Sequence, residues 1–451
     1  MPRAPGRGRA AAPHVSRRRD PATHALWPTL SPEQRAACAH VYAGAGSLLL
    51  CGAAGTGKSR VIEVVRDTAD AAVTATTACA ATLVGGVTLH SLLMWRPNQP
   101  FDEWAQRIKT VRTRLARVDV LVVDEASMLA RPDFETLDRM LRRAAKGIAA
   151  RAAGADAPFG GFRLMLVGDP LQLPPVKEAR SPTLEIRNKF VLSKVERHDN
   201  QILAFATGLR ESILNGTMPT FKSDNDDKGG VFCVDWRRMQ KQLEKAYTSD
   251  SYLSNQGNIK TIAWRNDTVA HYNAFVRKAI YGERADVEDF ILNERVVATH
   301  PIPKIDDERD IRMVTDEEAD VVALQTGPHP MFGDINCYWL TMESEFSELW
   351  AYGFVVHADS RRAYDARLNQ LAEQARKKAL PWSSFWGYKH TYFHDIRTCA
   401  SITAHRAQGS TYETVFVDVE DIMANYNKAE ALRCLYVAAT RSSRVLVMKT
   451  R

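Results

Sequence analysis

The residues best suited to chemistry lie at positions 52–59, Gly-Ala-Ala-Gly-Thr-Gly-Lys-Ser. They follow the apolar run Ser47–Cys51 and precede a helical stretch that begins at Arg60. Glycines in such a turn let backbone N–H groups point inward, and the start of a helix adds partial positive charge, so the segment can hold a phosphate. The pattern predicts that Lys58 neutralises the β- and γ-phosphates of ATP and that the Ser59 hydroxyl binds Mg²⁺. The predicted nucleotide contacts in this segment are Gly52, Gly55, Thr56, Gly57, Lys58, Ser59 and Arg60.

Two carboxylates stand at the end of a second apolar run, Val118–Val123. Asp124 can hold Mg²⁺ through water, and Glu125 can orient or deprotonate the attacking water. The alternative is a pair of acids that cap a helix starting at Ala126. The presence of Lys58 and Ser59 elsewhere in the chain favours the catalytic interpretation.

A third run, Arg163–Val167, leads into Gly-Asp-Pro-Leu-Gln, and we expect its glutamine, Gln172, to contact the γ-phosphate or the attacking water. Phosphoryl transfer also needs positive charge on the developing γ-phosphate oxygens, often from arginines of a second lobe. Arg197 and Arg441 are the candidates. Taken alone, each is better explained as a surface arginine.

Strands and helices alternate over residues 26–178, which predicts a parallel sheet covered by helices. A second set of strands is expected at Ile259–Trp264, Ala400–His405, Thr414–Val419 and Arg444–Met448. Residues 272–394 differ, because short β-like runs are followed by a charged helix at Arg361–Ala379. This pattern predicts a small β-domain inserted into a second α/β lobe.

Composition sets few further limits on the protein. The chain has 451 residues, 45% hydrophobic and 25% charged, and a net charge of +7. Residues 1–20 hold six arginines against one aspartate, so most of that charge lies in residues 1–25, which we expect to be a disordered basic tail with weak DNA affinity. Organelle targeting by this tail is an alternative. No apolar run is long enough for a membrane span, and seven scattered cysteines without a Cys-x-x-Cys pair favour a reducing compartment such as the cytoplasm.

Four ordered motifs resemble those of superfamily 1 helicases of group B, the RecD/Pif type. They are Asp-Glu-Ala-Ser-Met (124–128), Gly-Asp-Pro-Leu-Gln-Leu-Pro-Pro-Val (168–176), Thr-Ala-His-Arg-Ala-Gln-Gly-Ser (403–410) and Leu-Tyr-Val-Ala-Ala-Thr-Arg (435–441). Thr-Leu-His-Ser (88–91) and Pro-Trp-Ser-Ser-Phe-Trp (381–386) are similar to segments of the phage Dda type, which the chain resembles most. The resemblance covers about 26–451.

The resemblance implies an α/β fold with two RecA-like parallel-sheet lobes, an inserted SH3-like β-domain and a small aromatic protrusion. Lobe 1 is expected at 26–178 with the protrusion at about 92–112, lobe 2 at 179–271 and 395–451, and the inserted domain at 272–394. Trp95, Phe101 and Trp104 would lie at the protrusion, where an aromatic tip could stack on the last base pair. Core packing explains these rings equally well.

The resemblance also implies roles for single residues. Gln34 would bind the adenine, although a capping box with Ser31 explains it too. Gln172, Arg197 and Arg441 would complete the ATP site across the cleft between the lobes. The residues expected along the DNA path are Thr77, His90, Thr403 and His405. The family pattern has Pro-Thr-His where this chain has Thr76-Thr77-Ala78, which weakens the expected contact at Thr77.

Together these features predict an ATP- and Mg²⁺-dependent DNA helicase that moves 5′→3′ on single-stranded DNA and unwinds duplex forks, in replication, recombination or repair. The polarity rests on the resemblance alone. We expect a monomer in the cytoplasm, or the host cytoplasm if a phage encodes it, with a single-strand-binding protein or replisome component as a candidate partner and no membrane contact. The alternatives are a translocase that remodels protein–DNA complexes, a nucleotide-switched binding module without turnover, and RNA as the track.

Overall fold

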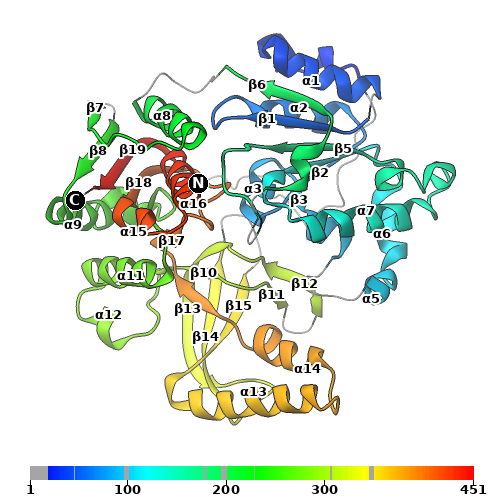
Figure 1. Ribbon diagram of the computed structural model, residues 1–451. Coiled ribbons are helices and arrows are strands. Elements are labelled where there is room, and N and C mark those ends of the chain that lie inside the picture. Colours follow the sequence, from blue (N-terminus) through cyan, green and yellow to red (C-terminus); the bar gives the residue numbers. More distant parts are fainter. Residues whose placement is uncertain are drawn as a thin grey trace, which may run out of the picture.

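The computed structural model describes residues 19–44, 46–95, 101–175, 178, 180–194, 201–227, 229–304, 307–344 and 350–450. They form two lobes, each built on a mainly parallel sheet, and a third, antiparallel β-domain beneath them (Figure 1). Among these residues, no helix combines the length and the apolar character that crossing a bilayer requires. The α/β architecture and the inserted β-domain confirm the predicted fold class.

Lobe 1 is built on a six-stranded parallel sheet of order β3-β2-β4-β5-β1-β6. Its strands are β1 (Leu48–Gly52), β2 (Ala71–Ala75), β3 (Val87–Thr88), β4 (Val120–Asp124), β5 (Arg163–Gly168) and β6 (Asn188–Leu192). Successive side chains of a strand point to opposite faces. Leu48 and Leu50 therefore pack with helices α1 and α2, whereas Leu49 packs with α6 and α7 on the other face. Because both faces are covered, the strands are continuously apolar.

The helices of lobe 1 follow the strands in sequence. They are α1 (Pro32–Ala43), α2 (Lys58–Thr68), α3 (Ala78–Leu83), α4 (Leu89–Leu93), α5 (Phe101–Ala105), α6 (Ile108–Leu115) and α7 (Arg131–Ala145). The strands of this sheet are parallel, so their carboxyl ends lie at the same edge. The ends of β1, β4 and β5 therefore meet at one rim of the sheet. The predicted phosphate loop, carboxylates and sensor all lie at this rim.

Lobe 2 has a six-stranded sheet of order β17-β9-β18-β19-β8-β7, parallel except for the edge strand β7. Its strands are β7 (Asp224–Asp226), β8 (Gly229–Val234), β9 (Ile259–Ala263), β17 (Ser401–Thr403), β18 (Tyr412–Asp418) and β19 (Ser442–Lys449). Its helices are α8 (Gln201–Asn215), α9 (Trp236–Tyr247), α10 (Asp250–Ser254), α11 (Asn266–Tyr281), α15 (Val419–Met423) and α16 (Lys428–Thr440). Helices α8 and α16 pack on one face and α9 and α11 on the other.

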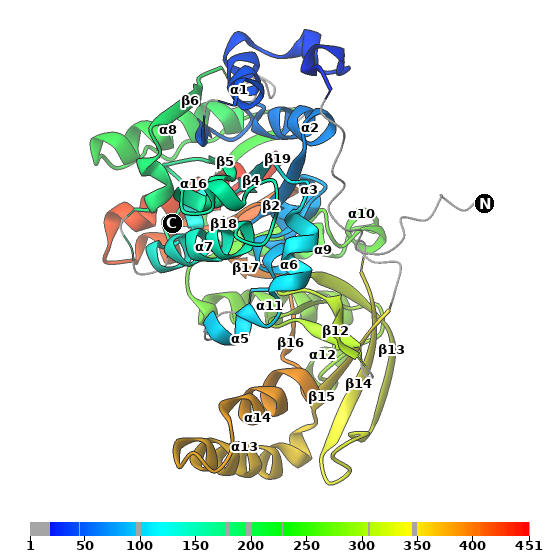
Figure 2. The same cartoon turned by 90° about the vertical axis from the view of Figure 1, so that its right-hand side faces the viewer.

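The inserted domain is a five-stranded antiparallel sheet of order β15-β14-β13-β10-β16, with the hairpin β11-β12 beside it. Its elements are β10 (Arg295–Ala298), β11 (Ile302–Lys304), β12 (Asp307–Met313), β13 (Glu318–Pro328), β14 (Asn336–Glu343), β15 (Ala351–Val356), β16 (Ile396–Thr398), α12 (Arg284–Val287), α13 (Arg361–Arg376) and α14 (Trp382–Trp386). Figure 2 shows α13 and α14 at the end farthest from the two lobes.

Three domain boundaries lie elsewhere than predicted. Lobe 1 extends beyond residue 178, because β6 pairs in parallel with β1. Helix α11 runs to Tyr281 and packs on lobe 2, so the insertion begins after it and not at 272. The insertion ends later than 394, because Ile396–Thr398 pairs with β10. Strand pairing assigns two of these junctions, and the packing of α11 assigns the third.

The predicted aromatic protrusion is mostly core. The Trp104 side chain has no exposed surface, and its indole N–H donates to the Leu93 carbonyl at 2.7 Å. Trp95 is 7% exposed and stacks on His90, while Phe101 packs against Trp104. The prediction that these rings form an aromatic tip is therefore wrong for Trp95 and Trp104, and core packing is the correct alternative. Residues 96–100 of the predicted protrusion lie outside the described residues.

We predict that Trp104→Ala destabilises the protein by about 3–5 kcal/mol, because it opens a cavity in the lobe 1 core and leaves the Leu93 carbonyl without its donor. Chemical denaturation followed by circular dichroism measures this change. Trp382→Ala, at a ring that is 44% exposed, is the control and should change stability little. Equal stability of the two variants would contradict the core assignment.

Candidate nucleotide and nucleic-acid site

The phosphate loop joins β1 to α2 and depends on glycine at two points. Gly57 caps α2 with φ of 81°, a left-handed conformation that favours glycine. A Cβ at Gly52 would collide with the Thr56 hydroxyl. The Lys58 ammonium donates to the carbonyls of Gly52 and Ala53 at 2.8 and 2.9 Å, so it lies within the loop where a phosphate would bind. Ser59 is exposed in the first turn of α2, directly after Lys58, and its predicted contact with Mg²⁺ stays a prediction.

Gln34 connects helix α1 to the phosphate loop. It forms the predicted capping box, since the Ser31 N–H donates to Gln34 Oε1 at 2.8 Å and the Gln34 N–H donates to Ser31 Oγ at 3.2 Å. Its side-chain amide also donates to the Thr56 carbonyl at 3.1 Å. The capping role is confirmed, and the adenine contact stays a prediction. Arg60, also a predicted nucleotide contact, donates to the Thr29 hydroxyl.

Asp124 and Glu125 end β4 at the same rim of the sheet. Burial, and then the neighbouring Glu125 carboxylate, raise the pKa of Asp124 to about 7. The Glu125 N–H donates to Asp124 Oδ1 at 2.9 Å, and Glu125 has φ of 50°, an unusual value for a residue with a side chain. The Lys58 charge opposes the rise in the pKa of Asp124, and a bound cation would relieve the repulsion between the two adjacent carboxylates.

Lobe 2 reaches this rim through Gln408, a residue that the sequence analysis did not single out. Its amide donates to Gln172 Oε1 at 2.9 Å and to Glu125 Oε2 at 3.4 Å. The predicted sensor and the predicted base of lobe 1 are therefore both bonded to one side chain of lobe 2. The position of this glutamine within Thr-Ala-His-Arg-Ala-Gln-Gly-Ser was the only feature of the sequence that could have indicated it.

Arg441, the predicted arginine of lobe 2, lies at the same boundary. It is 5% exposed, and its guanidinium donates to the carbonyls of Val437 and Ser410. Burial lowers its pKa, while the Glu125 carboxylate acts in the opposite direction. The field of Glu125 thus reaches Arg441, as expected for groups that face one cleft. Arg197, the other predicted arginine, lies outside the described residues.

The predicted DNA contacts fall into separate places. Thr77 caps α3 and lies beside the turn at Gly409, whose φ is 86° and where a Cβ would come within 3.2 Å of Ala80 Cβ. Thr403 ends β17, and His405 follows it, with its Nε2 3.9 Å from a Glu430 carboxylate oxygen. Thr77 of lobe 1 therefore meets the segment that carries Thr403 and His405. His90 lies in α4 and stacks on Trp95, which follows that helix. Burial lowers the pKa of His90.

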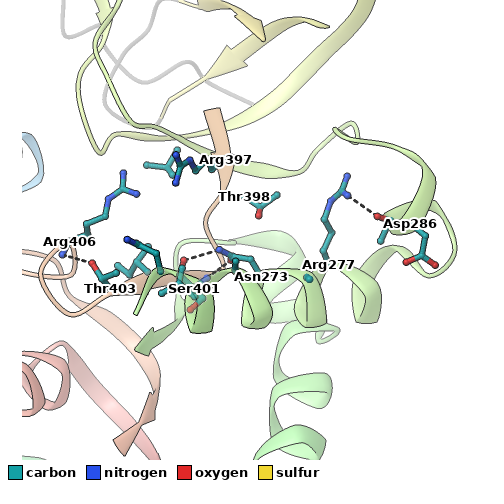
Figure 3. Close-up of a pocket in the computed structure, with 15 residues that line it drawn as sticks. Asn273, Arg277, Asp286, Arg397, Thr398, Ser401, Thr403 and Arg406 are labelled. Atoms are coloured by element: carbon teal, nitrogen blue, oxygen red, sulfur yellow. Dashed lines mark hydrogen bonds between the residues drawn. The ribbon is translucent and has the colours of Figure 1, made fainter. Parts of the chain in front are cut away.

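A cavity of about 340 Å³ opens at Thr403, between α11 of lobe 2 and the inserted domain. Figure 3 shows Asn273, Ser401 and Thr403 on one side and Arg397 and Thr398 on the other. Three arginines line it: Arg277, Arg397 and Arg406. Arg277 is held by Glu294 and by two carbonyls, and Arg406 by Asp316. Arg397 is the most exposed, at 61%, and pairs only with Asp395 among the described residues.

Comparisons with known proteins agree with this arrangement. A family model described as PIF1-like helicase matches residues 29–217, and one described as UvrD-like helicase C-terminal domain matches residues 398–448. The ATP-dependent DNA helicase PIF1 of Emericella nidulans is 36% identical over 148 residues, which are 30% of this chain and 19% of that protein. The chain thus aligns with less than a fifth of that helicase.

Two solved structures share the fold over nearly the whole chain. The Pif1 helicase from Candida albicans has a TM-score of 0.54 at 19% identity and covers 94% of each chain. The Pif1 helicase from Bacteroides in complex with ADP-AlF3 and ssDNA has a TM-score of 0.54 at 16% identity, and covers 93% of this chain and 92% of its own. The chain belongs to the Pif1-type group of superfamily 1 helicases. The predicted family is confirmed, and the closer likeness to the phage Dda type stays a prediction.

We predict that Lys58→Ala abolishes ATP hydrolysis of this Pif1-type protein, because it removes the only side-chain cation that the described phosphate loop holds at its carbonyls. Phosphate release in the presence of single-stranded DNA measures the loss. Lys146→Ala is the control, since that lysine is 52% exposed and pairs with Asp156 away from the loop. Normal turnover by Lys58→Ala would place the nucleotide elsewhere.

Proposed function

We propose that the protein is an ATP-dependent DNA helicase that moves along one strand and opens the duplex ahead of it. The observation that carries this proposal is the bonding of Gln408, from lobe 2, to both Glu125 and Gln172 of lobe 1. A nucleotide bound at Lys58 would be contacted by both lobes, so ATP binding favours their closure and hydrolysis favours their separation. Two lobes that alternately approach and separate can move a strand.

The chain's own residues divide the work of hydrolysis. Lys58 neutralises the phosphates, Glu125 orients the attacking water, and Gln172 contacts the γ-phosphate. Arg441 supplies positive charge from lobe 2 to the oxygens that gain charge in the transition state. The donor set of Asp124 and Ser59 fits Mg²⁺, because a half-buried carboxylate with a raised pKa and a hydroxyl lie at the phosphate loop. When bound, Mg²⁺ would neutralise negative charge on the phosphates.

The strand is expected to cross the boundary where Thr77 meets Gly409 and to continue past Thr403. Hydroxyl groups and arginines hold phosphates without reading bases, as a motor on any sequence requires. The Bacteroides Pif1 structure with ssDNA supports DNA as the track. We further propose that the protein moves 5′→3′ and acts in replication, recombination or repair. Its candidate protein partners in these processes are a single-strand-binding protein or a replisome component.

The experiment that tests this function is unwinding of duplexes that carry either a 5′ or a 3′ single-stranded overhang. We expect ATP-dependent opening of the 5′-overhang substrate and little opening of the other. Opening of only the 3′-overhang substrate would reverse the polarity. If DNA stimulates ATP hydrolysis but neither substrate is opened, the protein is a translocase and not a helicase.

The cavity beside Thr403 yields a test of the track. The exposed Arg397–Asp395 pair is worth little on its own, so Arg397 can exchange Asp395 for a DNA phosphate at small cost. We predict that Arg397→Ala weakens binding of single-stranded DNA and reduces the slope of log affinity against log salt by about 0.7, the value for one phosphate contact on a single strand. Arg376→Ala, at an exposed position of α13, should leave the slope unchanged. If the slope is unchanged in both variants, the DNA does not contact Arg397 in this cavity.

A further inference from the structure

The loop that carries the predicted sensor, residues 169–173, leaves the sheet of lobe 1 but packs into lobe 2. We name it the sensor loop. Leu173 is 1% exposed and belongs to the core cluster of lobe 2 together with Ile202 and Leu209 of α8, and Leu171 packs against the same cluster. Of the two leucines that flank Gln172 in sequence, Leu173 is therefore buried in the opposite lobe and Leu171 is partly buried against it.

Asp169, the first residue of the sensor loop, forms a buried polar triad with lobe 2. Its side chain has no exposed surface, and its Oδ2 accepts from the Tyr436 hydroxyl at 2.7 Å and from Arg210 Nη1 at 2.6 Å. Arg210 Nη1 also lies 2.8 Å from the Tyr436 hydroxyl oxygen. Tyr436 is on α16 and Arg210 on α8, so one carboxylate of lobe 1 is held by two helices of lobe 2. A buried carboxylate costs much free energy when it loses such partners.

Arg433 holds the backbone of the same loop. Its Nη1 donates to the carbonyls of Pro170 and Gln172, each at 2.7 Å. Burial lowers the pKa of Arg433, and Asp169 opposes that effect. Gln408 adds the bond to the Gln172 side chain itself, at 2.9 Å. Every residue from 169 to 173 therefore has a contact with lobe 2.

Among the described residues, no hydrogen bond joins residues 169–173 to the rest of lobe 1, and a cavity separates Pro170 and Gln172 from Ser127 and Ser181. Gly168 is still part of β5, where it pairs with Cys51 of the phosphate-loop strand. Pro174 and Pro175 then lead back toward lobe 1, where Ser181 donates to the carbonyls of Ala126 and Leu129. Any movement between the lobes must therefore bend the chain at these two ends, because the loop between them is fixed to α8 and α16.

We propose that the sensor loop moves as a part of lobe 2, and that Tyr436, Arg210 and Arg433 are positioning residues that make Gln172 follow that lobe. This inference rests on the proposed function and deepens it. When lobe 2 closes, Gln172 is carried to the γ-phosphate; when lobe 2 opens, Gln172 is withdrawn. Lobe movement on the DNA and contact with the γ-phosphate thereby become one event.

Tyr436→Phe is the sharpest test, because it removes the hydroxyl shared by Asp169 and Arg210 and keeps the ring. Tyr272→Phe is the matched control, since the buried Tyr272 hydroxyl donates to Asp418 at 2.8 Å entirely within lobe 2. We expect Tyr436→Phe to keep the KM for ATP and to lower the number of base pairs opened per ATP, because Gln172 would no longer follow lobe 2 in every cycle. Tyr272→Phe should keep the wild-type number.

A second readout separates positioning from general structural loss. The affinity for single-stranded DNA is measured once with ADP–aluminium fluoride bound and once with ADP bound. The ratio of the two affinities reports how strongly the nucleotide shifts lobe 2 between its closed and open positions. In Tyr436→Phe this ratio should fall toward one, whereas a merely structural defect would weaken both affinities together. Arg433→Gln, at a half-buried position, should reproduce the result if Tyr436→Phe folds poorly.

The outcomes distinguish this inference from the proposed function. If the wild-type protein opens no duplex, the proposed function fails. If the wild type opens duplexes and Tyr436→Phe and Arg433→Gln match Tyr272→Phe in base pairs per ATP and in the affinity ratio, the helicase stands and the positioning role is overturned.

Discussion

The structure depends on unbalanced charge at the boundary between two lobes. Asp124 and Glu125 stand at the end of a buried strand, where burial and mutual repulsion raise the pKa of Asp124. Lys58 lies in a loop of carbonyls, and Arg441 is buried on the opposite lobe. Among the described residues none of these groups forms a salt bridge, although Lys58 acts on Asp124 and Glu125 acts on Arg441 over a longer distance. A nucleotide with its cation would give all of them a close partner. The need for charge balance is what gives ATP its influence over the distance between the lobes.

Nucleotide binding can change the distance between the lobes only if each lobe moves as a rigid unit. Each sheet is covered by helices on both faces, and packed interiors transmit displacement without absorbing it. The sensor loop couples the two lobes, because it begins in the sheet of lobe 1 and buries Leu173 in the core of lobe 2. Its apolar anchors resist withdrawal, while its polar contacts set the orientation of Gln172.

The inserted domain is joined to lobe 2 by a buried ion cluster. The Lys260 ammonium, from β9 of lobe 2, donates to Glu318 of β13 at 2.7 Å and to the Cys399 carbonyl at 2.7 Å. Arg295 of β10 donates to the same carboxylate at 3.0 Å. Burial lowers the pKa of Lys260, but Glu318, Cys399 and two nearby tyrosines together raise it above its usual value. Lys260 and Arg295 hold the pKa of Glu318 below its usual value, so both groups stay charged. Separation would leave buried charges unpaired, which favours movement of the inserted domain together with lobe 2.

The sequence by itself determined the local chemistry: the phosphate loop, the carboxylates after β4, the capping box at Gln34 and most strand positions, because turn geometry and strand periodicity depend on neighbouring residues. It also indicated the family, since ordered motifs need no coordinates. Only the tertiary structure decided that Trp104 is core, that β6 belongs to lobe 1, and that Gln408, Asp169 and Tyr436 meet at the lobe boundary. These facts depend on pairing or contacts between residues more than a hundred positions apart, or on which side of a helix faces a partner. No local pattern records such contacts, because the free energy that selects them comes from burial in the folded whole.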